Sequence, residues 1–135
     1  MTSTNRHHRA PAGLAPGPGY SHVATGTGRM VYVAGQVALD EQGALVGDGD
    51  VEVQAEQVFI NLGHALRSAG ATFQDVVKLN YYLTDVTKLV AVRAVRDRHV
   101  DTDNPPASTL VEVKGLFRPE FLIEVEAVAI VNDTA

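Results

Sequence analysis

Two stretches of this sequence are apolar at nearly every position, and they constrain the fold more than any other feature. Residues 30–39 read MVYVAGQVAL, and residues 121–131 read FLIEVEAVAIV. Runs of this length and composition are typical of β-strands that need cover on both faces of their sheet. The fold must therefore supply a cover for each face.

Two segments have the periodicity of an amphipathic helix. Residues 51–70 carry apolar side chains at spacings of three and four, with Asp50 placed as an N-cap and Gly70 as a C-cap glycine. The apolar positions of this segment are Val51, Ala55, Val58, Phe59, Leu62, Leu66 and Ala69. Residues 87–100 form a second such segment, with inward-facing positions at Leu89, Val92, Val95 and His99. Two helices can cover only one face of a sheet, so we expect self-association to cover the other.

Further strand-like segments complete the pattern. Residues 20–25 and 30–39 are separated by GTGR, whose glycines suit a tight hairpin turn. Residues 75–85 and 107–113 are also typical of strands, and Val77, Leu79, Tyr81 and Leu83 share one face of the first. The resulting order, β-β-α-β-α-β-β, predicts an α+β domain in which two helices pack on one sheet of about five strands.

The length and the N-terminal composition indicate the domain organisation. A chain of 135 residues has the size of one domain. Residues 1–19 are rich in Pro, Gly, Ala and Arg, which predicts a flexible segment ahead of a single domain at residues 20–132. His7 and His8 are adjacent in this segment without a third convergent ligand, so we expect solvated side chains.

The overall composition argues against several classes of function. The chain has no cysteine, which excludes disulfides and cysteine-based zinc sites and fits a cytoplasmic location. Its net charge of −5 disfavours general binding to nucleic acid. No apolar run approaches the roughly 18 residues of a membrane helix.

Several ionisable side chains are candidates for a site. Glu124 and Glu126 share one face of an otherwise apolar strand, which predicts polar partners such as Arg29, Lys78 or Arg118. Paired structural carboxylates are one interpretation of this pattern, and a catalytic carboxylate is the other.

The second helical segment carries two arginines three residues apart. Arg93 and Arg96 project together, and the simplest interpretation is a solvated helix face with Asp97 as a counter-charge. The alternative is that Arg93 or Arg118 grips an anionic ligand.

Three histidines could titrate near neutrality. His64 has no acid or second histidine four residues later, and His99 ends a helix, so metal binding is not expected at either. His22 lies two residues after Tyr20 and is the histidine expected nearest a cleft.

The order and spacing of four motifs resemble the RidA/YjgF family, also called the L-PSP endoribonuclease-like or Rid family. These motifs are GPGYSHV, VYVAGQVALDEQGALV, VEVQAEQVFINLGHALRSAGATFQDVVKLNYYLTDV and the pair NPPASTLVEVKGL with FLIEVEAVAI, and together they cover about residues 18–131. The resemblance implies a chorismate-mutase-like subunit and a homotrimer with a barrel-like centre and three intersubunit clefts. It also implies hydrolysis of imines and enamines, such as 2-iminopropanoate and 2-aminoacrylate, to 2-oxo acids and ammonia without a metal or organic cofactor.

The same resemblance assigns residues to the cleft. Glu124 matches the glutamate that holds the attacking water, and Tyr20 matches the tyrosine at the cleft entrance. Ser108 stands where the family has an arginine for the substrate carboxylate, and serine cannot supply the charged, two-pronged pairing of a guanidinium. The other implied cleft positions are Ala34 in place of serine, Gly35, Arg93 in place of asparagine, Thr109, and Leu110 in place of cysteine.

These substitutions leave three functions open. The first is a cofactor-free imine or enamine hydrolase whose substrate differs from the usual amino-acid-derived imines. The second is a non-catalytic trimer that binds a small molecule, such as a carboxylate, or a partner. The third and weakest is an endoribonuclease, because the acidic chain lacks interleaved aromatic and basic residues.

Overall fold

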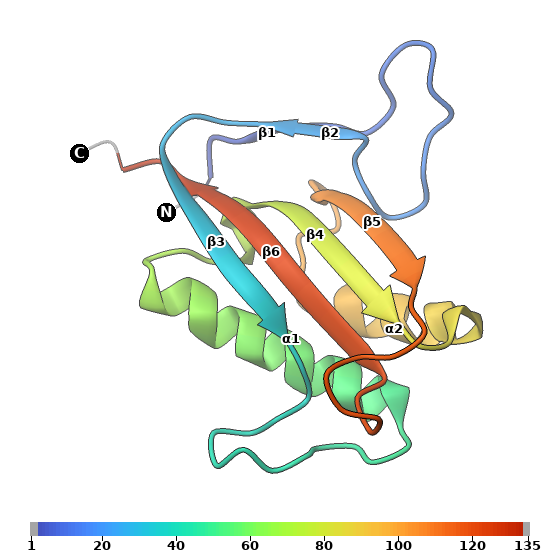
Figure 1. Cartoon of the computed structure of the whole chain (residues 1–135). Helices are drawn as coiled ribbons and strands as arrows, with labels where there is room; N and C mark the ends of the chain where they lie inside the picture. Colours follow the sequence, from blue (N-terminus) through green and yellow to red (C-terminus); the bar gives the residue numbers. More distant parts are fainter. Residues whose placement is uncertain (1–2, 134–135) are drawn as a thin grey trace.

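Four strands form a mixed sheet, and both helices lie on one of its faces (Figure 1). The structure is a computed structural model that describes residues 3–133. Across the sheet the order is β3 (Arg29–Gln36), β6 (Ile123–Val131), β4 (Val76–Leu83) and β5 (Ala107–Glu112). Strands β3, β6 and β4 pair antiparallel, whereas β4 and β5 are parallel. The α+β class with two helices on one sheet is thus confirmed, although this sheet has four strands rather than about five.

The first helix, α1 (Val51–Ser68), forms with the predicted caps. The Asp50 carboxylate accepts hydrogen bonds from two backbone N–H groups of the first turn. At the other end Gly70 has a φ of 74°, a left-handed conformation that glycine adopts without strain. A short 3-10 helix, η1 (Phe73–Asp75), then leads into β4.

The second helical segment is shorter than its sequence pattern predicts. It begins with a 3-10 turn, η2 (Val86–Lys88), and continues as α2 (Leu89–Arg96). Val92 and Val95 are buried as predicted, and His99 is half-buried beyond the end of the helix. Helix α2 and its flanking loops connect the parallel strands β4 and β5, as a parallel pairing requires.

The N-terminal segment that the composition predicts to be flexible contains a strand. Strand β1 (Arg6–His8) pairs antiparallel with β2 (Val23–Thr25) in a separate two-stranded sheet near one end of the main sheet (Figure 1). The hairpin predicted across GTGR is therefore wrong, because β2 pairs with β1 while β3 pairs with β6. The Asn5 amide group fixes the start of the chain, since it donates to the backbone oxygens of Asp75 and Ile130.

The hydrophobic core lies between the sheet and the two helices. Its largest fully buried side chains include Phe59, Leu62, Leu66, Leu79, Leu83 and Ile123. Most of the predicted inward positions of α1, and Leu79, Tyr81 and Leu83 of β4, belong to this core. Val51 and Ala69 are only partly buried against it, and Val77 is buried outside this cluster.

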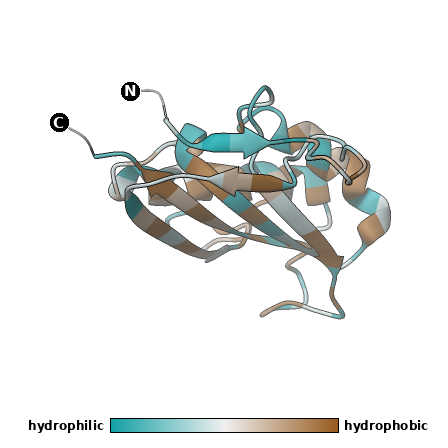
Figure 2. Ribbon diagram, turned by 90° about the horizontal axis from the view of Figure 1, so that it is seen from above, coloured by the Kyte–Doolittle hydropathy of each residue, from teal (hydrophilic) through white to brown (hydrophobic). Residues whose placement is uncertain are grey.

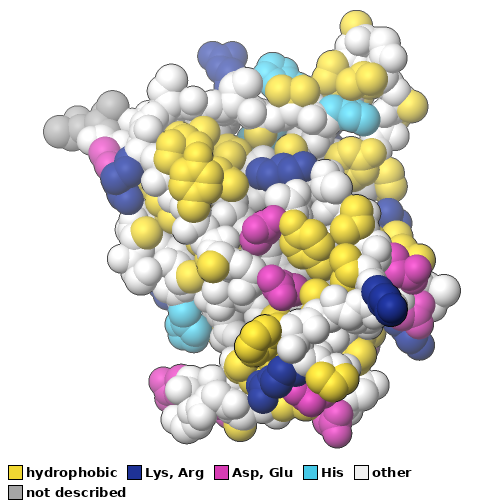
Figure 3. Space-filling model, viewed as in Figure 1, with side chains coloured by type: hydrophobic (Ala, Val, Ile, Leu, Met, Phe, Trp, Pro, Cys, Tyr) yellow, Lys and Arg dark blue, Asp and Glu magenta, His cyan; other side chains and the backbone are white. Residues whose placement is uncertain are grey.

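The opposite face of the sheet has no helix over it among the described residues (Figure 1). Met30, Tyr32 and Val111 are exposed there, and Tyr32 keeps 75% of its surface. Hydrophobic segments run along the strands (Figure 2), and a space-filling view shows acidic side chains among hydrophobic ones on this face (Figure 3). We call it the open face. Its cover by self-association stays a prediction.

Candidate functional site

A cavity of about 360 Å³ lies between α2, strands β4 and β5, and the loop that precedes β2. We call it the α2–β5 cavity. Four residues that the resemblance assigned to a cleft line it: Tyr20, Arg93, Ser108 and Leu110. Its other lining residues are Pro18, Tyr81, Val86, Leu89, Val92 and Arg96. The fold thus brings together candidates from three separate segments of the sequence.

Arg96 contributes a buried cation to this cavity, so the expectation of a solvated Arg96 is wrong. Only 8% of its surface is exposed. Its Nε and Nη2 atoms each lie 2.9 Å from Oδ1 of Asp97, which is the predicted counter-charge. Gly19 makes room for the guanidinium, because a Cβ atom there would lie 2.3 Å from Nη2. The inward position was readable in the sequence, since Arg96 follows Leu89 by seven residues and Val92 by four.

Two more polar groups line the α2–β5 cavity and have no partner among residues 3–133. Arg93 is half-buried and makes no ion pair or side-chain hydrogen bond with any residue the structure describes. Tyr81 is 2% exposed, and its hydroxyl has no hydrogen-bond partner in the described part of the chain. Burial raises the pKa of Tyr81, and the nearby charge of Arg96 offsets only part of this effect. At neutral pH the cavity therefore offers two cations and a protonated phenol.

Glu124 lies in a second hollow, of about 400 Å³, which we call the β3–β6 hollow. Its other lining residues are Gly35, Val37, Leu39, Phe117, Arg118 and Phe121. The carboxylate packs directly on the backbone of β3, because a Cβ atom at Gly35 would lie 2.0 Å from Oε2 of Glu124. Gly35 and Glu124 are thus brought together as expected, and only glycine leaves this space free.

Arg118 also lines the β3–β6 hollow but is already engaged. Its Nε atom lies 3.1 Å from Oε1 of Glu120, and its guanidinium stacks over the ring of Phe121 at 4.6 Å. Phe117 is 89% exposed beside it. The hollow therefore combines one half-buried carboxylate with a mostly apolar wall.

The strand register places the two sites on opposite faces of the sheet. Leu110 pairs with Tyr81, whereas Glu124 pairs with Tyr82. Neighbouring residues of a strand point to opposite faces, so Ser108 and Leu110 lie on the helix side and Glu124 lies on the open face. One copy of the chain consequently cannot bring Glu124 and the α2–β5 cavity against the same small molecule.

Glu126 has a structural environment next to Glu124 on the open face. It accepts hydrogen bonds from the Asn80 amide at 3.2 Å and the Tyr82 hydroxyl at 2.5 Å, so it has polar partners as predicted, but these are neutral groups and not the named cations. Its hydrogen bond raises the pKa of Tyr82; burial and the charges of Glu126 and Glu124 act in the same direction. Lys78 instead bonds to the Thr109 hydroxyl at 2.7 Å.

Other assigned residues lie outside both the α2–β5 cavity and the β3–β6 hollow. Thr109 faces the open side and is held by Lys78. Ala34 is exposed on β3, and its carbonyl accepts a hydrogen bond from the Gln36 side chain. His22 packs edge-on against Tyr20 at 5.4 Å and contacts the Ala15 carbonyl, but it does not line the cavity.

The remaining helical histidines have structural contacts. His64 is paired with a guanidinium nitrogen of Arg67 at 2.8 Å. His99 contacts the Glu56 carboxylate and stacks on Phe59 at 5.3 Å. The described residues contain no group of three His, Asp or Glu side chains placed to hold a metal ion. No helix in the described part of the chain is long and apolar enough to cross a membrane.

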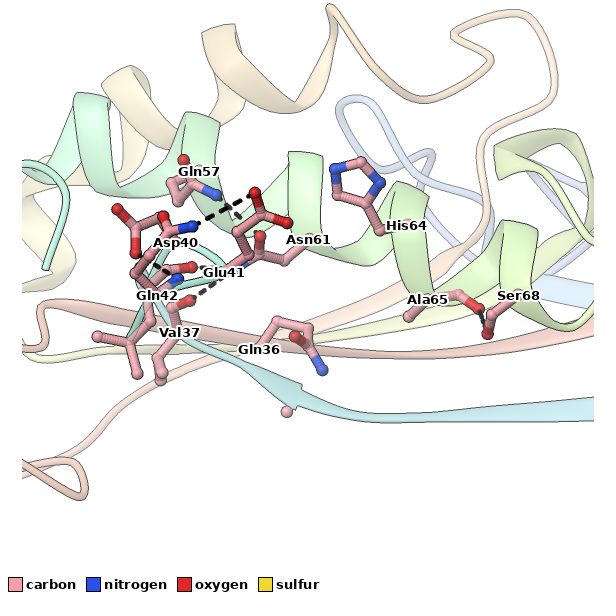
Figure 4. Close-up of a pocket in the computed structure, with 12 residues that line it drawn as sticks. Gln36, Val37, Asp40, Glu41, Gln42, Gln57, Asn61, His64, Ala65 and Ser68 are labelled. Carbon is pink, nitrogen blue, oxygen red and sulfur yellow. Dashed lines mark hydrogen bonds between the residues drawn. The ribbon is translucent and has the colours of Figure 1, made fainter. Parts of the chain in front are cut away.

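A third and larger hollow, of about 900 Å³, lies between α1 and the loop after β3 (Figure 4). Its amides serve the fold: Asn61 donates to the carbonyls of Val37 and Leu39, and Gln57 donates to Asn61. Of the assigned residues it contains only Gly35, so it does not unite the candidates.

Comparison with known proteins gives a consistent picture. The sequence profile of the family described as "Endoribonuclease L-PSP" matches residues 10–131. A RutC family protein of Synechocystis sp. is 38% identical over 90% of this chain and 91% of its own length. A 2-iminobutanoate/2-iminopropanoate deaminase of Mus musculus is 33% identical over 90% of this chain and 86% of its own. The crystal structure of a Rid family protein of unknown function from Yersinia pestis has a TM-score of 0.82 at 36% identity, covering 94% of this chain and 98% of its own.

Proposed function

We propose that this chain, which belongs to the endoribonuclease L-PSP (Rid/YjgF) family, hydrolyses a small imine or enamine to an oxo compound and ammonia. The observation that carries this proposal is the Glu124 carboxylate, held half-buried against Gly35 in a mostly apolar hollow. A carboxylate so placed can orient a water molecule and accept its proton. The name of the mouse relative, an imine deaminase, supports the same chemistry.

The reaction needs only water and proton transfers. Glu124 accepts a proton from water as the water oxygen bonds to the imine carbon, and the imine nitrogen takes a proton from the Tyr20 hydroxyl. The resulting carbinolamine then loses ammonia. The nitrogen takes the proton held by Glu124, the carbinolamine hydroxyl returns a proton to Tyr20, and the carbon–nitrogen bond breaks to leave a carbonyl.

The reacting groups must come from different copies of the chain. Glu124 lies on the open face and Tyr20 lines the α2–β5 cavity on the helix side. We infer a cyclic homotrimer with a barrel-like centre, in which the open face of each copy meets the α2–β5 cavity of the next. Such a head-to-tail contact closes after three copies and also covers the exposed Met30, Tyr32 and Val111.

Complementation between inactive variants tests this arrangement. Glu124→Gln and Tyr20→Phe are each expected to lower the rate of hydrolysis of 2-iminopropanoate by about 100-fold or more. The 2-iminopropanoate that remains is measured by trapping it as its semicarbazone. When the two variants are unfolded together and refolded, roughly a quarter of the interfaces between neighbouring copies combine an intact Glu124 with an intact Tyr20. Recovery of activity in the mixture supports the proposal. A mixture as inactive as its parents, formed from well-folded trimers, contradicts it.

A non-catalytic binding protein is the second candidate, and one observation favours it. Ser108 occupies the position at which the family resemblance implies a carboxylate-binding arginine. If wild-type protein leaves the decay of 2-iminopropanoate and 2-iminobutanoate unchanged but binds their 2-oxo acid products, the binding function replaces the catalytic one.

A further inference from the structure

The α2–β5 cavity is lined by two positively charged side chains, Arg93 and Arg96, and by no Asp or Glu side chain in the part of the chain that the structure describes. Arg93 has no counter-charge among the described residues, and Arg96 is only partly neutralised by Asp97, itself half-exposed as a side chain. Two guanidinium groups and one carboxylate leave a net charge of about one positive unit beside the cavity. Buried charges are costly unless they are paired, so an arrangement of this kind indicates that an anion binds here.

The geometry of Arg96 shows a constructed site. Both contacts to Asp97 use one edge of the guanidinium, through Nε and Nη2. The Nη1 group makes no hydrogen bond with any residue the structure describes and is left for a ligand. Gly19, with a φ of 73°, brings the backbone so close to Nη2 that any larger residue would displace it. The loop before β2 is therefore shaped around this arginine.

Neutral donors surround the two cations. The Tyr81 hydroxyl is buried and has no acceptor in the described chain, and Ser108 lines the same cavity from β5. An arginine forms two parallel hydrogen bonds with a carboxylate, and such charge-assisted bonds are about twice as strong as neutral ones. A planar carboxylate would satisfy the free edge of Arg96 and the unpaired Arg93, with the phenol and the serine as further donors.

We propose that the α2–β5 cavity binds the carboxylate of a small 2-imino or 2-oxo acid through Arg96 and Arg93 of helix α2. The helix thereby supplies the charge that Ser108 on β5 lacks. This inference rests on the proposed function for its choice of ligand, and what it adds is the pair of side chains that binds the carboxylate in this chain. Arg96 binds the carboxylate from the buried wall of the cavity, and Arg93 binds it from the half-buried side.

The experiment measures binding separately from turnover. Calorimetric titration of the trimer with pyruvate, a 2-oxo acid, is compared with titration with methyl pyruvate, which has the same carbonyl but no charge. We expect binding of pyruvate alone. Arg93→Gln and Arg96→Gln should each weaken it by about 10- to 100-fold, because each removes charge-assisted hydrogen bonds. Arg98→Gln is the matched control, since Arg98 is exposed, pairs with Glu56 and lies outside the cavity.

Two further variants keep the test decisive. If Arg96→Gln fails to fold, Gly19→Ala displaces the same guanidinium by a steric clash, and also strains the backbone at its φ of 73°, and should weaken pyruvate binding similarly. Glu124→Gln should lower turnover by about 100-fold or more but leave the preference for pyruvate over methyl pyruvate, because the carboxylate is held by Arg93 and Arg96, so loss of catalysis and loss of carboxylate binding are distinguishable. Binding that is unchanged in Arg93→Gln, equal for methyl pyruvate, or equally strong for inorganic phosphate overturns the proposal, as does a wild-type protein that binds no pyruvate.

Discussion

Replacement of Gly35 by alanine isolates the role of the Glu124 carboxylate without removing it. An added Cβ atom would lie 2.0 Å from Oε2 of Glu124, and ordinary contact begins at 3.4 Å, so the carboxylate must move by about 1.4 Å. A misplacement of about 1 Å in a catalytic group can lower a rate by roughly 100-fold. We therefore expect Gly35→Ala to lower kcat/KM for 2-iminopropanoate by about two orders of magnitude.

The same change should have little effect on stability. Gly35 does not have a positive φ, so alanine fits its backbone and restricts the unfolded chain, which stabilises by about 0.4–1 kcal/mol. Rotation of Glu124 away from its preferred position costs about 0.5–1.5 kcal/mol, so the two effects nearly cancel. Thermal denaturation measures this balance.

Gly115→Ala provides the control for Gly35→Ala. A Cβ atom at Gly115 meets no atom within 4 Å, so this variant should keep both activity and stability. A Gly35→Ala protein that is folded and as active as wild type would refute the reasoning, because it would show that the position of the Glu124 carboxylate is immaterial. Loss of activity caused by unfolding would appear as a lowered melting temperature.

Three further predictions address assembly, titration and local stability. Tyr32→Asp places a charge on the open face and should convert the proposed trimer of 14.4 kDa chains into monomers, as measured by sedimentation velocity, whereas Ile60→Asp on the outer side of α1 should not. The pKa of Tyr82 is raised, so the contribution of this side chain to the free energy of unfolding is complete below about pH 10 and is lost as the pH rises through the raised value. Tyr82→Phe should therefore remove a late step from the ultraviolet titration of the tyrosines. It should also reduce the loss of stability at alkaline pH. Asp50→Ala removes the N-cap of α1 and should lower the free energy of unfolding by about 1 kcal/mol in urea denaturation, with activity retained.

Most of the fold could be predicted from local patterns. Helix α1 shows three independent signals, namely its apolar spacing, its N-cap and its C-cap glycine, and these agree with the structure at both ends. The pairing of β2 could not be predicted in this way. The GTGR sequence is compatible with a hairpin, but the strands it joins find longer-range partners in β1 and β6. Such tertiary pairings have no signature in a short window of sequence.

The candidate site was predictable only in part. The family resemblance indicated Tyr20, Ser108 and Leu110, and these do line one cavity. The buried state of Arg96 followed from its helical position, but the presence of Asp97 favoured an exposed ion pair. The division of the site between two faces of the sheet required the strand register, because it depends on which residues of β4 lie opposite Leu110 and Glu124.

Restoring an arginine at position 108 tests whether helix α2 already supplies the charge. If Ser108 were simply a lost anchor, Ser108→Arg would raise kcat/KM for 2-iminopropanoate by about tenfold or more, the usual worth of a charged hydrogen bond. With Arg93 and Arg96 already lining a cavity of about 360 Å³, a third guanidinium instead occupies the space of the ligand and faces two like charges. We therefore expect Ser108→Arg to bind pyruvate no better than wild type and to melt at a lower temperature, with Ser108→Gln as an uncharged control of similar length. An increase in both affinity and turnover on Ser108→Arg would show that the arginines of α2 do not face the carboxylate.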